Sequence, residues 1–223
     1  NDYFVEAIKK YPGRLKAVAL VDPLKGESGA CELAQIYENS DLFGFKIEVN
    51  STFQCNTNGR MTDKVMEPIW ECVNQYEQPV FIHELRDCDL DDTLKLSNKY
   101  KKVKFIICHM GADSCFGNNI RKENYDILLD AVKRSENIYL DTSSVPFYFN
   151  EEYPFPTSVR IIEKAYNTVG AERIMWSSDY PGMCNFATLQ QLINLVKNQC
   201  KHISDEDKEL IMGKNAEKIL FNK

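Results

Sequence analysis

Short runs of apolar and β-branched residues recur along the chain and predict six buried β-strands. Several of these runs are apolar on both faces, as is typical of strands in a parallel sheet that is covered on both sides. The predicted strands comprise residues 15–22, 43–50, 79–85, 104–111, 137–144 and 173–179.

Segments with the 3.6-residue apolar spacing of amphipathic helices separate these strands. Ser204, with Asp207 three residues later, predicts the capped start of a further helix that runs through Ile211. The other predicted helices comprise residues 28–38, 65–76, 125–132, 159–169, 189–196 and 215–221.

Strand and helix alternate about every 30 residues, which indicates βαβ connections and a parallel α/β sheet. Two architectures have this alternation, the open doubly wound sheet and the TIM-type (β/α)8 barrel of about 250 residues. No glycine-rich phosphate loop follows any predicted strand, which disfavours a nucleotide-binding open sheet. The 223 residues show no internal linker, so we expect a single domain over residues 1–223.

Composition excludes several classes of function. A net charge of -6 disfavours nucleic acid and anionic membranes as partners. No apolar run approaches the roughly 20 residues that span a bilayer, and no signal-peptide pattern opens the chain, so we expect a cytoplasmic protein. The eight cysteines form no Cys-x-x-Cys pair, and Cys72 and Cys108 fall on predicted core faces. They are interpreted as small hydrophobic residues in a reducing compartment rather than as a disulfide framework.

Polar residues follow the predicted strands, at the end where parallel α/β folds place catalytic side chains. The chain has only three histidines, and two of them, His83 and His109, end predicted strands. The complete set of these residues is Asp22, Glu48, His83 with Glu84, His109, Asp141 and Asp179.

Histidines and carboxylates at strand ends favour metal-assisted hydrolysis. A zinc-like ion takes imidazole and carboxylate ligands and lowers the pKa of its bound water to about 7. A second carboxylate can accept the proton of that water. Each histidine taken alone is as often a structural residue as a ligand. Asp22 is interpreted as a turn cap, Asp141 either as a cap or as a pocket residue, and His202 as a surface residue.

Five short motifs in a fixed order resemble the amidohydrolase superfamily. They are "FIHE", "FIICHMGA", "IYLDTSS", "RIMWSSDYPG" and "GKNAEKILF", and the resemblance covers essentially the whole chain. The sequence is most similar to the amidohydrolase family 2 branch, which holds aminocarboxymuconate-semialdehyde-decarboxylase-like proteins. The resemblance implies a (β/α)8 barrel and a divalent metal cofactor, with zinc as the expected ion.

The resemblance also implies a role for individual residues. His83 matches a metal-binding histidine at the end of the family's fifth strand. His109 matches the sixth-strand histidine that contacts substrate or bound water. Asp179, in "SSDYP", matches the eighth-strand aspartate that ligates metal and serves as a base. Glu84 and Arg86 are candidate substrate-binding residues beside His83, or else solvated residues at the barrel rim.

One family motif is missing from this chain. The first strand of the family normally carries His-x-His or Glu-x-His, and the sequence contains neither. Counting back from Asp179 as the end of the eighth strand makes residues 15–22 the third strand. We therefore expect a barrel that lacks its first two strands here, with the remaining metal ligands upstream of Asn1. Lys46 resembles the carboxylated lysine of other superfamily members, which this branch usually lacks.

The sequence thus predicts a metal-dependent hydrolase of a small carbonyl- or carboxyl-bearing molecule. Asp179 and His109 are its catalytic residues, and His83 and Asp179 hold the metal. Two alternatives stay open, a non-oxidative decarboxylase of the same superfamily and a non-catalytic truncated barrel that serves as a binding or scaffold subunit. The aromatic loop at residues 143–156 fits either a pocket wall or a homodimer interface, because members of this branch often pair.

Overall fold

The computed structural model describes residues 1–49, 52, 59–83, 89–112 and 122–221. Contacts within the chain divide it into two compact units, Asn1–Ile106 and Ile107–Lys223. Each unit is built from parallel strands and the helices that follow them, which is the α/β arrangement predicted from the sequence.

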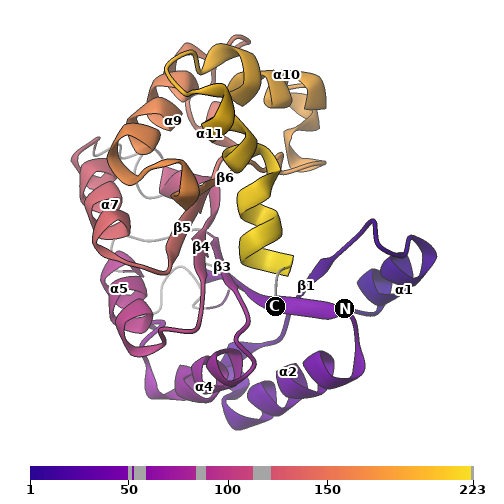
Figure 1. Cartoon of the computed structure of the whole chain (residues 1–223). Helices are drawn as coiled ribbons and strands as arrows, with labels where there is room; N and C mark the ends of the chain where they lie inside the picture. The colour runs from indigo at the N-terminus through magenta and orange to yellow at the C-terminus, as the bar shows by residue number, and fades with distance from the viewer. Residues whose placement is uncertain (50–51, 53–58, 84–88, 113–121, 222–223) are drawn as a thin grey trace. The chain divides into compact units, whose positions relative to one another are not determined.

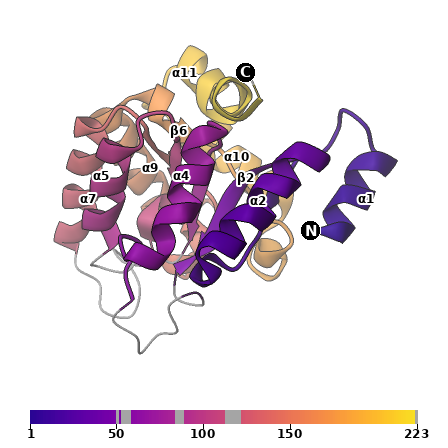
Figure 2. The same ribbon diagram turned by 90° about the horizontal axis from the view of Figure 1, so that it is seen from below.

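The first unit carries its strands in the order β1-β2-β3-β4, which is also their order along the chain. β1 pairs with β2 and β2 with β3, in both cases in parallel. The helices α2 and α4 lie side by side (Figures 1 and 2). The elements are α1 (Asp2–Lys10), β1 (Ala17–Ala19), α2 (Glu27–Asn39), β2 (Leu42–Glu48), α4 (Glu67–Gln75), β3 (Val80–His83), α5 (Asp89–Lys99) and β4 (Phe105–Ile107), whose last residue falls in the second unit.

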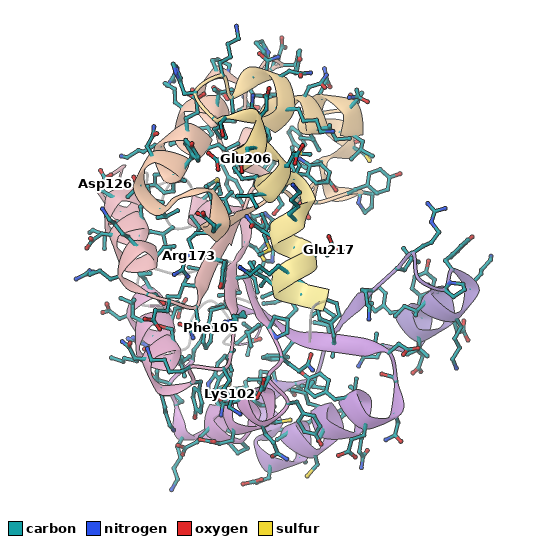
Figure 3. The ribbon with its side chains drawn as sticks, in the orientation of Figure 1. Lys102, Phe105, Asp126, Arg173, Glu206 and Glu217 are labelled. Carbon is teal, nitrogen blue, oxygen red and sulfur yellow. The ribbon has the colours of Figure 1, made fainter. Side chains whose placement is uncertain are left out.

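In the second unit, β5 pairs in parallel with β6. The helices α7 and α9 pack against each other, and Asp126 of α7, labelled in Figure 3, forms an ion pair with Lys164 of α9. The elements are α7 (Lys122–Arg134), β5 (Ile138–Asp141), α8 (Val145–Tyr148), α9 (Pro156–Val169), β6 (Ile174–Met175), α10 (Leu189–Asn194) and α11 (Asp205–Glu209). Segments of π-helix, Leu195–Gln199 and Leu210–Lys214, directly extend α10 and α11.

Large buried side chains form the hydrophobic core of each unit. In the first unit, the ring of Trp70 on α4 lies 6.4 Å from that of Phe45 on β2 and 6.3 Å from that of Phe105 on β4. The indole nitrogen of Trp70 donates to the carbonyl of Met61, so its one polar atom is satisfied. In the second unit, Tyr125 and Ile162 bring α7 and α9 into the core.

All six predicted strands are present, and the four whose predicted ranges are fully described are shorter than predicted. The strand expected over residues 104–111 ends at Ile107, and the one expected over residues 173–179 ends at Met175. Helix α5 was not among the predicted helices, because its apolar residues are few and its first turn is acidic. Cys72 and Cys108 are buried, as predicted. Among the residues described, no helix is both long enough and apolar enough to cross a membrane.

Candidate active site

His83 is the last residue of β3, and it lies beside the last residue of β2. The parallel register of the two strands pairs His83 with Glu48, and the His83 Nδ1 atom hydrogen-bonds a carboxylate oxygen of Glu48. The other oxygen of Glu48 forms an ion pair with Lys46, 2.8 Å away. His83 therefore ends a strand as predicted, and a carboxylate on the neighbouring strand sets the orientation of its ring.

The electrostatics of this pair keep Glu48 ionised at neutral pH. The hydrogen bond from His83 lowers the pKa of the Glu48 carboxyl to about 2, burial opposes this shift, and Lys46 adds to it. An ionised carboxylate can only accept, so the Nδ1 atom of His83 carries the proton. Because Lys46 is an ammonium partner of Glu48, its contacts do not favour the carboxylated-lysine interpretation.

His109 lies beyond the end of its strand, which corrects the sequence prediction. β4 ends at Ile107, and residues Cys108–Gly111 form a tight 3-10 turn. His109 (φ 56°), Met110 (φ 54°) and Gly111 (φ 67°) are consecutive residues with left-handed backbone conformations. Non-glycine residues adopt this conformation at a free-energy cost of about 1–3 kcal/mol, and such residues cluster at functional sites.

A buried network holds His109 in place. The Asp141 Oδ1 atom, at the end of β5, accepts from the backbone nitrogens of His109 and Ser143, each 3.0 Å away, and from the Ser143 hydroxyl. The Ser143 Oγ atom lies 2.7 Å from the His109 Nδ1 atom. Asp141 thus acts as a cap for two loops, one of the two roles that its sequence left open.

Asp179 lies four residues after the last residue of β6, which corrects its predicted position at a strand end. Its backbone is left-handed (φ 50°), and its Oδ2 atom accepts a hydrogen bond from the hydroxyl of Ser144, which is also left-handed (φ 54°). Ser143 and Ser144 are consecutive, and they contact His109 and Asp179 respectively. Both predicted catalytic residues therefore lie at the same end of β5.

Aromatic side chains adjoin this end of β5. The Tyr148 ring lies 6.0 Å from the His109 ring, and Phe147 packs edge-on against Phe186 with their centroids 4.8 Å apart. Phe147, whose ring lies 5.4 Å from that of Tyr148, and Phe186 are 46% and 47% exposed, so this pair presents apolar surface next to Tyr148. The aromatic loop noted in the sequence thus places one of its rings, that of Tyr148, near the predicted catalytic residue His109.

The predicted metal ligands fall in different units, His83 in the first and Asp179 in the second. Their shared role therefore stays a prediction. Glu84 and Arg86 lie outside the described residues. Within the parts of the chain that are described, no group of three or more His, Cys, Asp or Glu side chains is arranged to hold a metal ion. The donor chemistry of His83 nevertheless fits a metal ion. Glu48 holds its ring through Nδ1, and zinc-binding histidines are usually anchored by a carboxylate in this way.

The sequence placed Glu48 among the polar strand-end residues but gave it no role in the site, and it did not point to Ser143 or Ser144. Glu48 alternates with Lys46 along one strand, as ordinary strand residues do, and only the register with β3 shows its contact with His83. The serines directly follow "LDT" at the end of a predicted strand. Their position at a strand end was the available signal, and their small hydroxyl side chains gave no reason to single them out.

Comparison with known families decides the membership of the chain. The family model Amidohydro_2, described as Amidohydrolase, matches residues 1–221. The chain belongs to this amidohydrolase family. The membership predicted from the five motifs is thereby confirmed. No curated protein matches this amidohydrolase.

Solved structures similar to this amidohydrolase include three enzymes. An amidohydrolase from Burkholderia multivorans with bound zinc has a TM-score of 0.78 at 14% identity, over 98% of this chain and 78% of that one. A probable 2-pyrone-4,6-dicarboxylic acid hydrolase from Acinetobacter baumannii, with citric acid bound, has a TM-score of 0.75 at 20% identity, over 98% and 78%. A dihydroxybenzoic acid decarboxylase from Polaromonas sp. JS666, with manganese and 2-nitroresorcinol, has a TM-score of 0.69 at 18% identity, over 98% and 72%.

At these identities the likeness shows the fold alone. It confirms the predicted α/β fold class of the TIM-barrel type, here with six strands among the described residues. The chain spans 72–78% of the length of the three matched chains.

Proposed function

We propose that this protein is a metal-dependent hydrolase of a small carbonyl- or carboxyl-bearing molecule. The observation that carries the proposal is the placement of His109 and Asp179 at one end of β5 by two consecutive serines. Membership of the amidohydrolase family supports it. The zinc-bound and manganese-bound relatives support a divalent metal as the cofactor.

Each site residue has a task that follows from its contacts. His83, held through Nδ1 by Glu48, would give its Nε2 atom to a metal ion, and Asp179 would give a carboxylate oxygen. A bound divalent ion would supply Lewis-acid chemistry and a more acidic water molecule. Because Ser144 occupies Oδ2 of Asp179, the Oδ1 atom is the oxygen that would accept a proton from the attacking water. His109 would polarise the substrate or exchange a proton with it.

Non-oxidative decarboxylation is the second candidate function, and the aromatic cluster that adjoins His109 through Tyr148 favours it. Phe147, Tyr148 and Phe186 offer ring faces and edges to a flat substrate. Both the Polaromonas decarboxylase and the Acinetobacter hydrolase are named for planar carboxylic acids. We therefore propose a planar carboxylic acid as the substrate class for either reaction.

Product analysis separates the two reactions. The protein is incubated with zinc or manganese and with two probes, a carboxyl-13C-labelled dihydroxybenzoic acid and a pyrone dicarboxylic acid. Release of labelled CO2 identifies a decarboxylase, and uptake of base in a pH-stat identifies a hydrolase. Activity on neither probe would contradict the proposed substrate class and favour a non-catalytic binding subunit.

A matched pair of histidine variants then tests the site. His109→Asn keeps a residue that tolerates the left-handed backbone, and it is expected to lower kcat by about 100-fold or more. His202→Ala is the control, because His202 is exposed and outside this site. Equal activity of the two variants would contradict the assignment of His109.

A further inference from the structure

Among the residues that the structure describes, Ser143 contacts both His109 and Asp141 through its side chain. Its Oγ atom lies 2.7 Å from the His109 Nδ1 atom and hydrogen-bonds the Asp141 Oδ1 atom. Its backbone carbonyl oxygen is a second partner of the same His109 nitrogen, at 3.2 Å. All three residues are buried, with exposed fractions of 3% for Ser143, 6% for His109 and 7% for Asp141.

The hydrogen-bonding capacity of these groups assigns the protons. A serine hydroxyl has one proton, and a carboxylate oxygen can only accept, so the Ser143 hydroxyl donates to Asp141. The Ser143 Oγ atom then faces His109 as an acceptor. A backbone carbonyl is also an acceptor only. The two described partners of the His109 Nδ1 atom therefore require that this nitrogen carries the hydrogen.

We propose that Ser143, acting with Asp141, is a positioning residue that holds neutral His109 in the Nδ1–H tautomer. In this tautomer the lone pair of the imidazole is on Nε2, so His109 presents a proton acceptor rather than a donor. The catalytic role of this tautomer rests on the proposed function. The tautomer itself is inferred from the contacts of His109 with Ser143 and of Ser143 with Asp141.

The chain makes this assignment directly measurable, because it contains only three histidines. The probe is the 15N spectrum of the imidazole rings in the uniformly 15N-labelled protein, recorded at a pH where the rings are neutral. The spectrum of His109→Asn identifies the His109 signals. We expect protonated Nδ1 and unprotonated Nε2 for His109, the reverse of the tautomer that free histidine prefers in water.

Variants of Ser143 test the cause. Ser143→Ala removes the closer acceptor and the link to Asp141 and leaves only the backbone carbonyl at 3.2 Å, so the His109 signals are expected to move partly toward the Nε2–H tautomer. Ser143→Thr keeps a hydroxyl and is expected to keep the wild-type tautomer. Ser178→Ala is the matched control, because the Ser178 hydroxyl oxygen accepts only from the backbone nitrogen of Tyr180 among the contacts described. The His83 and His202 signals report whether each variant folds.

Two results would overturn the proposal. One is an Nε2–H tautomer of His109 in the wild-type protein, which needs no variant to detect. The other is a folded Ser143→Ala protein with an unchanged tautomer. With an active substrate, Ser143→Ala should also lower kcat by about 10- to 100-fold and leave KM nearly unchanged. A protein with the expected tautomer but no activity would contradict the proposed function and leave the tautomer assignment intact.

Discussion

Gly182 lies where any side chain would touch the Asp179 carboxylate. A Cβ atom added to Gly182 would be 3.0 Å from the Asp179 Oδ2 atom and 3.4 Å from its Cγ atom. The φ angle of Gly182 is outside the left-handed region, so alanine is compatible with the backbone there. The absence of a side chain at this position leaves the carboxylate and its bond to Ser144 undisturbed.

Gly182→Ala is therefore expected to displace the Asp179 carboxylate and lower kcat by about 10-fold or more. The melting temperature should change little, because the carboxylate is exposed and can move. Gly213→Ala is the control, since a Cβ atom there meets nothing within 4 Å. Steady-state kinetics of the two variants check the prediction. Full activity of Gly182→Ala would show that the position of the Asp179 carboxylate is not critical.

Gly111 is constrained by its backbone and by its packing. It lies in the same turn as His109. Its φ angle is 67°, and an added Cβ atom would lie 2.5 Å from the Leu128 Cδ2 atom of α7. Gly111→Ala is expected to lower the free energy of unfolding by about 2 kcal/mol or more, from strain and overpacking together. Urea denaturation beside Gly213→Ala measures this. A loss no larger than that of the control would contradict the role assigned to Gly111.

For individual residues, the sequence predicts which side chains belong to the candidate site better than it predicts their geometry. His83, His109 and Asp179 stand out as polar residues after apolar runs. The left-handed turn at His109 and the contact of Glu48 with His83 could not be predicted. Both depend on contacts with residues that are 32 to 35 positions away in the sequence.

Among the elements, α5 shows what the apolar pattern leaves out. Its first turn contains Asp89, Asp91 and Asp92, which in the sequence resemble a polar loop. Negative charges stabilise the N-terminus of a helix, and Asp92 also has a tertiary partner. The guanidinium of Arg60 donates to both Asp92 oxygens, at 2.8 Å and 2.6 Å, and Thr62 adds a bond of 3.1 Å. The ion pair anchors the chain at Arg60 to α5.

The Arg60–Asp92 pair predicts a pH-dependent part of the stability. Burial raises the pKa of the Asp92 carboxyl, but the hydrogen bonds from Arg60 and Thr62 lower it by a larger amount. The pKa of Asp92 therefore lies below its ordinary value. A carboxyl with a lowered pKa in the folded state stabilises the fold above its unfolded pKa of about 3.9. This contribution is lost as the pH falls through the folded-state pKa.

Asp92→Asn is expected to lower the free energy of unfolding by about 2 kcal/mol near pH 7, because it removes the charged partner of Arg60. The difference from wild type should shrink as the pH falls below about 4. Asp91→Asn, an exposed change in the same helical turn, is the control and should have little effect. Urea denaturation at a series of pH values provides the test. A constant difference at all pH values would contradict the assignment.

Other elements follow closely from local sequence signals. The Ser204 hydroxyl oxygen accepts from the Asp207 backbone nitrogen, so the predicted cap of α11 is confirmed. Asp22 accepts from the Leu24 backbone nitrogen, as its interpretation as a turn cap requires. These signals are predictable because donor and acceptor are only two or three residues apart. Strand ends proved less predictable, since they depend on which neighbouring strands supply hydrogen bonds.

For the whole molecule, the alternation of strand and helix was enough to predict the α/β class, and the order of five motifs was enough to predict the family. The family match over residues 1–221 confirms membership, and the similar solved structures confirm the barrel fold class. What the sequence could not provide is the network of Asp141, Ser143 and Ser144 that places His109 and Asp179 together. Identification of the released product would distinguish hydrolysis from decarboxylation.

Metal content is the most direct test of the central proposal, which is a metal-dependent reaction with His83 and Asp179 as proposed ligands. The whole protein as it is made in the cell is analysed by inductively coupled plasma mass spectrometry, beside a His83→Ala, Asp179→Ala double variant and a His202→Ala control. We predict about one divalent transition metal per chain in the wild type and control, lost in the double variant. Absence of metal from the wild type, or its retention in a folded double variant, would contradict the account.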